Sequence, residues 1–368
     1  MARTLESEIK MKLGYFTQPF HPTTKNLSQS LEEDHEAAVI ADRNGYTEAI
    51  FGEHATDAFE TITSSLTFIS SLCYQTKYIK LGTGTINIPN THPALVASTV
   101  SMLDHMLKGR LLIGVSMGAL PTDWEIYGSL ELNKEAMFEE AMFQIIELWK
   151  RKAPYNLKGS FWEISSEKTM NTQLGLGEIM KPFQKPHPEI LCTALSPNSI
   201  GLKKAGQKGW SPVSSNFIQE QFVSSHWKQY SDGAKIAKIK PDQSKWRVAK
   251  MIFVNEDHKK AIQYGKGLDG PYAQCINQII KKLTFANKLN ILKENENQHD
   301  RDITLEYCID KLVIAGDPIS VKDQIYKFVE KTGNFGTLLY VGVDWLDKSL
   351  AKKSMELMAN KVIYNMSI

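Results

Sequence analysis

The sequence predicts an α/β protein in which eight strands alternate with helices and close into a parallel (β/α)8 barrel. Short apolar runs alternate with helical segments along most of the 368 residues. The first apolar run is not followed by a GxGxxG turn, which weighs against an open dinucleotide-binding sheet. These two observations favour a closed barrel, in which side chains at the carboxyl ends of the strands meet at one face.

The first half of the chain contains four predicted strand–helix units. Strands are expected at 11–16, 48–52, 79–86 and 111–116. Helices are expected at 28–44, 61–75, 93–107 and 134–150, and the first and last of these carry apolar residues at helical spacing. Gly45 ends the first helix.

The second half contains four more units and two interruptions. Strands are expected at 189–194, within GWSPVSS, at 246–254 and at 337–343, with helices at 200–208, 218–237, after Gly316-Asp317-Pro318, and at 347–362. Residues 153–188 are rich in Pro, Gly and Lys, and residues 256–308 include the polar run KENENQHDRD. We therefore expect one barrel domain, 11–368, with insertions at about 153–188 and 256–308, preceded by an N-terminal extension at 1–10.

Composition excludes several classes of protein. The formal net charge is +2, so no strong field favours nucleic acid or an anionic membrane. No run approaches the roughly 20 apolar residues of a membrane-spanning helix, and the start of the chain is not a secretory signal. The four cysteines form no CxxC pair, which indicates free thiols in a reducing cytosol. We expect a cytoplasmic protein.

Five segments occur in the order GYTEAIFGEHATD, LGTGTINIPNTHP, LDHMLKGRLLIGVSMGALPTDWEIYG, KPFQKPHPEILCTALSPNSIGLKKAG and GDPISVKDQIYKFVEKTGNFGTLLYVGVDW. Together they resemble the bacterial luciferase-like flavin monooxygenases, and in particular the limonene-monooxygenase-like subgroup. The resemblance implies a barrel that binds reduced FMN at the carboxyl ends of its strands. Oxygen then adds to give a peroxyflavin, which oxidises a small, fairly apolar organic substrate, and a separate flavin reductase supplies the reduced FMN.

The resemblance places a functional histidine at His54, just past the second predicted strand. Peroxyflavin chemistry needs a group that holds or donates a proton near neutral pH, for which imidazole is suited. The alternative is a histidine that only hydrogen-bonds neighbouring loops. Glu53, His54 and Asp57 also look like a fragment of a metal site, but further ligands at recognisable spacing are missing, so no metal is expected.

The phosphate of FMN is expected at Ser196, Asn198 and Ser199, which open a helix after the fifth predicted strand. N–H groups at a helix start and nearby hydroxyls bind phosphate. The same residue types are also ordinary helix caps, and the two interpretations are compatible.

The isoalloxazine ring is expected near the ends of the third and fourth strands. Thr83 and Gly84 end the third strand, where glycine lets a flat ring approach the backbone or instead marks a bulge. Asn87 follows on the same rim as a hydrogen-bonding group. Ser116 and Met117 end the fourth strand, and Met117 stands where some family members have a phosphate-binding arginine, so a different phosphate contact is expected.

Trp124, Tyr127 and Trp162 are candidate walls of the substrate pocket, although aromatic residues are more often part of a core. Asp104 and Arg110, on either side of a Lys-Gly turn, are expected to form a structural ion pair.

A homodimer is expected through the helices at 61–75 and 93–107. Both carry small residues, which let helix backbones approach closely, and the family uses this arrangement; the small residues include Ser65, Ser70, Ala97, Ser98 and Ser101. The alternative is that these faces pack on the chain's own barrel.

Two other functions remain open from the sequence: a deazaflavin-dependent hydride-transfer enzyme of the same fold, and a catalytically silent flavin-binding protein. The substrate, and the choice between hydroxylation, Baeyer–Villiger insertion and epoxidation, depend on loop side chains that vary without changing the fold.

Overall fold

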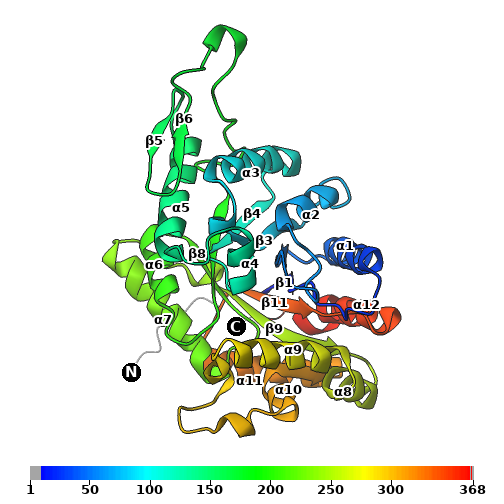
Figure 1. The fold of residues 1–368 in the computed structure, drawn as a ribbon. Helices are drawn as coiled ribbons and strands as arrows, with labels where there is room; N and C mark the ends of the chain where they lie inside the picture. Colours follow the sequence, from blue (N-terminus) through cyan, green and yellow to red (C-terminus); the bar gives the residue numbers. More distant parts are fainter. Residues whose placement is uncertain (1–9, 365, 367–368) are drawn as a thin grey trace, which may run out of the picture.

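A computed structural model describes residues 10–364 and 366 as a closed parallel barrel surrounded by helices (Figure 1). Eight strands pair in a closed ring, in which the last strand pairs with the first and the sixth pairs with the seventh. In ring order they are β1 (Lys12–Thr17), β2 (Glu48–Phe51), β3 (Lys80–Asn87), β4 (Leu111–Ser116), β7 (Glu189–Ala194), β8 (Ser211–Ser214), β9 (Arg247–Val254) and β11 (Thr337–Gly342). The predicted (β/α)8 fold is confirmed; of the expected extension at 1–10, all but Lys10 lies outside the described residues.

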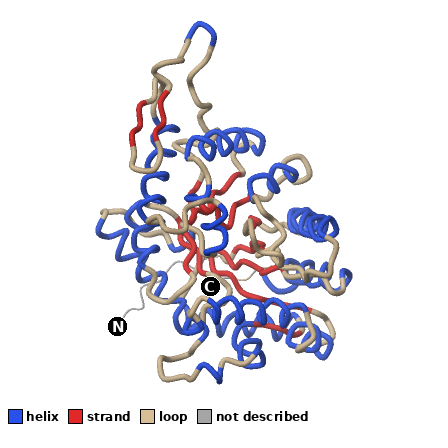
Figure 2. The backbone as a smooth tube through the Cα atoms, in the orientation of Figure 1, coloured by secondary structure: helices blue, strands red, loops and turns tan. Residues whose placement is uncertain are grey.

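Helices cover the outside of the strands, which lie at the centre of Figure 2. The outer helices are α1 (Leu27–Arg43), α2 (Ser65–Leu72), α3 (Pro93–Leu107), α5 (Lys134–Lys150), α6 (Ile200–Lys208), α7 (Glu220–Ile236), α11 (Pro318–Thr332) and α12 (Lys348–Leu357), which continues as the π-helix η6 (Met358–Ile363). A short helix, α4 (Pro121–Ile126), lies between β4 and α5. The sequence did not predict α4; the bounds of the helices that it did predict agree closely with the observed ones except at α2.

Helix α2 is shorter than the predicted 61–75 because neighbouring loops hold the residues before it. The N–H of Thr61 bonds to the carbonyl of Pro19, and the carbonyl of Ile62 accepts from the N–H of His54. Ser64 then caps the helix by accepting from the N–H of Thr67. The backbone groups of 61–62 are therefore used in loop contacts rather than in a helical turn.

The two interruptions add structure outside the ring of strands, and the second packs against the barrel's own core. In the first, β5 (Asn156–Lys158) and β6 (Glu163–Ser165) make an antiparallel hairpin that projects away from the barrel at the top of Figure 1. The second contains α8 (His258–Lys266), α9 (Pro271–Phe285), η4 (Leu289–Leu292), η5 (Asp300–Asp302) and α10 (Leu305–Leu312). It leads into β10 (Val313–Gly316), a strand that pairs with β9 outside the ring and that the sequence did not predict.

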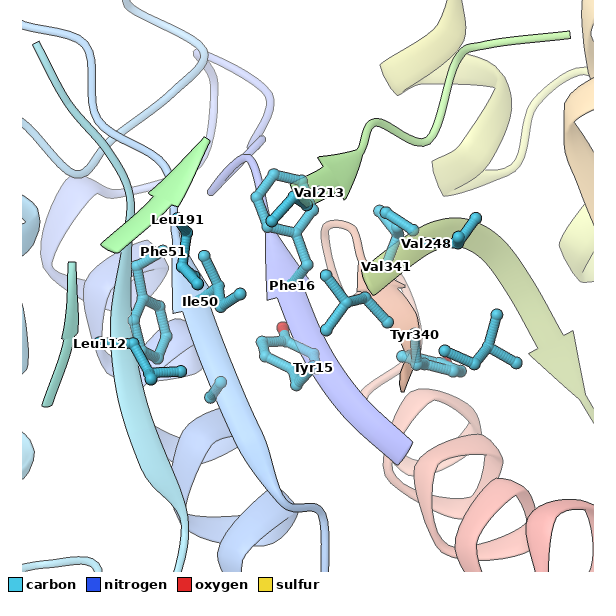
Figure 3. Packing of buried hydrophobic residues seen from close by; sticks show 14 of the residues in the cluster. Tyr15, Phe16, Ile50, Phe51, Leu112, Leu191, Val213, Val248, Tyr340 and Val341 are labelled. Atoms are coloured by element: carbon cyan, nitrogen blue, oxygen red, sulfur yellow. The ribbon is translucent and has the colours of Figure 1, made fainter. Parts of the chain in front are cut away.

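The barrel interior is packed with apolar side chains, some of which appear in Figure 3. Gly84 is needed in this packing, because a Cβ there would lie 2.5 Å from Cγ2 of Ile50 and 3.1 Å from Cε2 of Phe16. Deeper in the barrel, the buried guanidinium of Arg247 donates to Glu48 at 2.6 Å and to Glu189 at 2.9 Å. These residues lie on β9, β2 and β7, which are not neighbours around the ring. The ion network therefore crosses the barrel interior and links three separate strands.

The predicted ion pair between Asp104 and Arg110 is wrong. Gln184 donates to the buried carboxylate of Asp104 from its backbone N–H and its side chain, both at 2.8 Å. Arg110 instead donates to backbone carbonyls, including that of Ile79 at 2.7 Å.

Among the described residues, no helix combines the length and apolar character needed to cross a bilayer.

Candidate functional site

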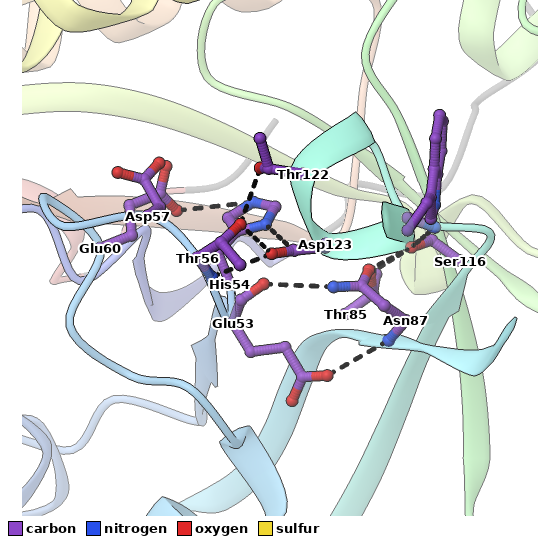
Figure 4. A network of polar contacts seen from close by, with 12 residues as sticks. Glu53, His54, Thr56, Asp57, Glu60, Thr85, Asn87, Ser116, Thr122 and Asp123 are labelled. Carbon is purple, nitrogen blue, oxygen red and sulfur yellow. Dashed lines mark hydrogen bonds and ion pairs between the residues drawn. The ribbon is translucent and has the colours of Figure 1, made fainter. Parts of the chain in front are cut away.

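His54 lies at the carboxyl end of β2, inside a group of charged side chains (Figure 4). Its Nδ1 is 3.0 Å from Oδ2 of Asp123, and its Nε2 is 3.8 Å from Oε2 of Glu60. Asp123 comes from α4, and its second oxygen accepts from the N–H and the hydroxyl of Thr56. The imidazole is 19% exposed, so it is held firmly and still reaches the surface of the site.

The charge on His54 is set by these neighbours. Burial of the imidazole lowers its pKa, but Glu60 and Asp123 outweigh that effect, and the pKa is raised above the ordinary value. Burial raises the pKa of Asp123, but hydrogen bonds from His54 and Thr56 more than compensate, and the pKa is lowered. Asp123 is therefore ionised and accepts the proton at Nδ1 of His54, which leaves Nε2 as the atom that can take up or release a proton.

Lys282 on α9 connects the second insertion to this group. Its Nζ lies 2.7 Å from Oε1 of Glu60 and also contacts Asp57. The ammonium shares Glu60 with His54, and its positive charge lowers the pKa of the histidine. The site therefore contains one cluster in which negative and positive side chains alternate, in the order Asp57, Lys282, Glu60 and His54.

Glu53, next to His54, faces the opposite way and organises the ends of β3 and α2. Its half-buried carboxylate accepts from the N–H and the hydroxyl of Ser65 at 2.8 and 2.6 Å, and from the N–H of Asn87 at 3.2 Å. The side chain of Asn87 donates to the carbonyl of Glu53 and accepts from the hydroxyl of Ser116 at 3.0 Å. Ser116 in turn accepts from the hydroxyl of Thr85 at 2.6 Å. Glu53, His54 and Asp57 therefore do not converge on one point.

The predicted residues at the ends of β3 and β4 divide into two kinds. Asn87 and Ser116 lie in the polar network beside His54, as Figure 4 shows. Thr83 is buried and donates its hydroxyl to the carbonyl of Gly114 at 2.8 Å, so its side chain supports the barrel wall. A Cβ on Gly84 would meet the side chains of Ile50 and Phe16, so close packing inside the barrel explains why a glycine stands at this position. The register between β3 and β4 shifts here, which is the bulge expected as the alternative.

Ser196, Asn198 and Ser199 form the loop between β7 and α6. Ser199 caps α6 by accepting from the N–H of Leu202, and Asn198 has a left-handed φ of 53°. The first backbone N–H groups of α6 have no acceptor within the helix. Together with the hydroxyls of the half-exposed Ser199 and the exposed Ser196, they make a donor set without a carboxylate, which suits a phosphate group.

The aromatic candidates lie in two different places. Trp124 on α4 donates its indole N–H to the carbonyl of Met117 at 3.1 Å, and Tyr127 at the end of α4 is 51% exposed. Both therefore belong to the segment that carries Asp123. Trp162 lies on the hairpin of the first insertion, where its backbone bonds to Glu140 and Gln144 of α5. It is not brought together with the strand-end residues.

Known proteins are similar to this chain in both sequence and fold. A sequence model described as luciferase-like monooxygenase matches residues 11–334. The chain is 26% identical over 372 residues to 3,6-diketocamphane 1,6-monooxygenase of Pseudomonas putida, which covers 96% of this chain and 97% of that one. It is 26% identical over 357 residues to limonene 1,2-monooxygenase of Rhodococcus erythropolis, with 96% and 86% covered.

A solved structure is similar over nearly the whole length. It is the oxygenating constituent of 3,6-diketocamphane monooxygenase from the CAM plasmid of Pseudomonas putida, a type II Baeyer–Villiger monooxygenase in complex with FMN. The TM-score is 0.88 at 26% identity, and the match covers 97% of this chain and 99% of that one.

Proposed function

The chain belongs to the luciferase-like monooxygenase family, and we propose that it is the oxygenase component of an FMN-dependent monooxygenase that oxidises a small, fairly apolar organic molecule. The observation that carries this proposal is the placement of His54, paired with Asp123, at the strand ends beside the Asn87–Ser116 network. The names of two relatives are those of monooxygenases of a diketocamphane and of limonene. We therefore propose compact cyclic terpenoids as the substrate class.

Different residues of the site bind the FMN phosphate, line the rim and hold the proton. Reduced FMN, when bound, supplies the electrons that activate O2 for transfer of one oxygen atom to the substrate. Ser196, Ser199 and the start of α6 bind its phosphate. Asn87, Ser116 and Met117 line the rim, and Trp124 and Tyr127 border the substrate. His54 holds a proton at Nε2 and passes it to negative charge that develops on oxygen.

Further features follow from this role. An oxygenase component needs a separate flavin reductase to supply reduced FMN, and we propose one as partner. We also propose a cytoplasmic location, in keeping with four free cysteines. The barrel at 11–368 with its two insertions acts as one domain.

The test is turnover with reduced FMN, 18O-labelled O2 and a panel containing a bicyclic ketone and limonene. We expect oxygen uptake and a product that contains one labelled oxygen atom. His54→Ala is expected to lower turnover about 100-fold with little change in FMN affinity. Substrate reduction without oxygen uptake would instead indicate a deazaflavin-type hydride transfer. Tight flavin binding without any product would indicate a catalytically silent flavin-binding protein.

The phosphate site is tested by Ser199→Asp, with Ser199→Asn as the matched control. Both residues still cap α6, but only aspartate places a negative charge beside the phosphate. We expect Ser199→Asp to weaken FMN binding about tenfold and to leave the binding of riboflavin, which has no phosphate, unchanged. Equal FMN affinity in the two variants, measured by flavin fluorescence, would show that Ser199 is only a cap.

A further inference from the structure

His226 is a completely buried histidine on α7 that contacts two segments at the barrel mouth. Its Nδ1 lies 2.8 Å from the hydroxyl of Ser214, the last residue of β8. Its Nε2 lies 2.9 Å from the carbonyl oxygen of Ser196, the first residue of the SPNS loop (Ser196–Ser199). Both ring nitrogens are therefore hydrogen-bonded, and Nε2 contacts the backbone of this loop.

The hydrogen-bond partners of His226 fix its protonation. A carbonyl oxygen only accepts, so Nε2 carries a proton. The indole N–H of Trp246 donates to the hydroxyl of Ser214 at 3.0 Å, so the hydroxyl proton of Ser214 is directed to Nδ1. Burial lowers the pKa of His226, which keeps the ring neutral. The result is a directed chain of donors from Trp246 through Ser214 and His226 to Ser196.

The neighbouring residue of α7 holds a second point of the loop. The hydroxyl of Ser225 accepts from the N–H of Asn198 at 3.0 Å and donates to the carbonyl of Phe222 at 2.6 Å. Asn198 has the left-handed φ of 53°, so this hydrogen bond stabilises a backbone conformation that residues other than glycine adopt infrequently. Helix α7 thus contacts the loop at its first and third residues.

Helix α7 cannot move easily relative to α6, which the loop enters. A Cβ on Gly206 of α6 would lie 2.1 Å from the carbonyl oxygen of Tyr230, and one on Gly233 of α7 would lie 1.9 Å from that of Lys203. The two backbones are therefore in direct contact. This contact makes α7 a fixed support for the loop.

We propose that His226 is the positioning residue of the phosphate-binding loop. It holds the carbonyl of Ser196 towards the protein interior, so that the exposed side of the loop presents hydroxyl and N–H donors. A carbonyl oxygen turned outwards would face the phosphate with a partial negative charge and oppose binding. This inference rests on the proposed function, since it assumes that FMN binds with its phosphate at the SPNS loop.

Two amide substitutions separate the two ring contacts. In His226→Asn the amide lies near the position of Nδ1, so it keeps the contact to Ser214 and loses the one to Ser196. In His226→Gln the amide reaches the position of Nε2 and can still donate to Ser196. Ser225→Ala removes the support of Asn198 and forms an independent third variant at a less buried position.

The experiment measures the affinity of each variant for FMN and for riboflavin by flavin fluorescence. We expect His226→Asn to weaken FMN binding about tenfold with riboflavin binding unchanged, His226→Gln to keep the wild-type affinity for both, and Ser225→Ala to lose about threefold for FMN alone. Equal losses of FMN and riboflavin affinity in His226→Asn, or no loss of FMN affinity in that variant, would overturn the inference.

The same measurement separates this inference from the proposed function. If the wild-type protein binds FMN no better than riboflavin, the phosphate site itself is refuted. If the wild type prefers FMN and His226→Asn retains that preference in full, only the role of His226 is refuted. Should His226→Asn fail to fold, His226→Gln decides: it keeps the contact to Ser196 and is expected to keep the preference for FMN, so a loss of that preference in His226→Gln would overturn the inference.

Discussion

The environment of His54 favours a proton donor over a base. Two carboxylates, from Asp123 and Glu60, face the two ring nitrogens, and one lysine moderates their effect. The balance raises the pKa of the imidazole, so the protonated form is favoured more strongly near neutral pH than in an exposed histidine. A protonated ring stabilises negative charge on a nearby oxygen and can then neutralise it.

Asp123→Asn tests this electrostatic role. The substitution removes a charge that raises the pKa of His54, so the histidine loses its proton at lower pH. We expect the alkaline limb of the kcat profile to move to lower pH, with turnover at pH 8 falling about tenfold. The pH dependence of kcat measures this. An unshifted limb would show that His54 does not control it.

Lys282→Met is expected to act in the opposite direction. The lysine lowers the pKa of His54, so its loss leaves Glu60 free to stabilise the protonated ring. The alkaline limb should then move to higher pH. Lys281→Met, at an exposed position one residue earlier on the same helix, is the control and should leave the profile unchanged. A shift to lower pH for Lys282→Met would contradict the assignment.

The sequence could point to His54 but not to its partners. His54 follows a buried strand in a local pattern, so its place on the rim is predictable. Asp123 is 69 residues away, and Lys282 is 228 residues from His54 in an insertion with no predicted contact to β2. Their convergence depends on how loops fold over the barrel. The TD pair at the start of α4 was the available signal for Asp123, because an acidic residue in the first helical turn is favoured there.

At the scale of elements, the same distinction between local and distant interactions explains what was predicted. Helix α3 begins at Pro93 and ends before the left-handed Lys108, and both signals are local, so its bounds were predictable. Strand β10 has only four residues between two helices, VIAG, and is stabilised by pairing with β9. Its short apolar run carries no period that distinguishes a strand from a helix end.

The loops after β1 and β11 are joined by a buried charge cluster that no local pattern indicates. Nδ1 of His21 lies 2.7 Å from Asp344, and its Nε2 lies 3.2 Å from Asp34. Lys25 binds both Asp344 and Glu33. His21, Glu33 and Asp344 are close enough together to resemble a metal site, but the ammonium of Lys25 already neutralises two of them.

This cluster predicts that stability falls at alkaline pH. Burial lowers the pKa of His21, but Asp34 and Asp344 outweigh it and raise the pKa from 6.5 to about 9. Because the folded-state pKa is the higher one, the stabilisation is complete below about pH 6.5 and is lost as pH rises through about 9. The difference corresponds to about 3 kcal/mol.

Urea unfolding between pH 6 and 9.5 measures this effect. We expect the wild-type midpoint to fall over that range, and His21→Gln to start lower and change less. His299→Gln, at an exposed position, is the control and should follow the wild type. If His21→Gln keeps the wild-type slope, another group causes the alkaline loss.

At the scale of the whole molecule, α2 and α3 each have one face on the barrel and one face open. Ser65, Ala97 and Ser101, which the sequence suggested for an interface, are buried within the chain. Ser65 in particular holds Glu53, so it belongs to the site and not to a contact between copies. Large exposed apolar side chains lie instead on α3, at Leu95 and Met102, and in the segment that follows α2, at Tyr74 and Tyr78.

We propose that these open faces form the contact of a symmetric homodimer. Exposed apolar side chains on one surface are typical of protein interfaces. In a twofold contact each surface meets its own copy, so one substitution introduces two changes. Ser98 lies on α3 between Leu95 and Met102, at a position where a larger side chain would separate the surfaces.

Ser98→Arg is therefore expected to convert the dimer to a monomer, since each copy would bury a guanidinium group without a partner in the contact. Light scattering coupled to gel filtration should give the wild type about twice the chain mass of 41.6 kDa, and the variant a mass near one chain. Ser28→Arg on the exposed start of α1 adds the same charge elsewhere and should leave the dimer intact. A wild-type mass near 41.6 kDa at micromolar concentration would refute the dimer, and a dimeric Ser98→Arg variant would move the contact away from α3.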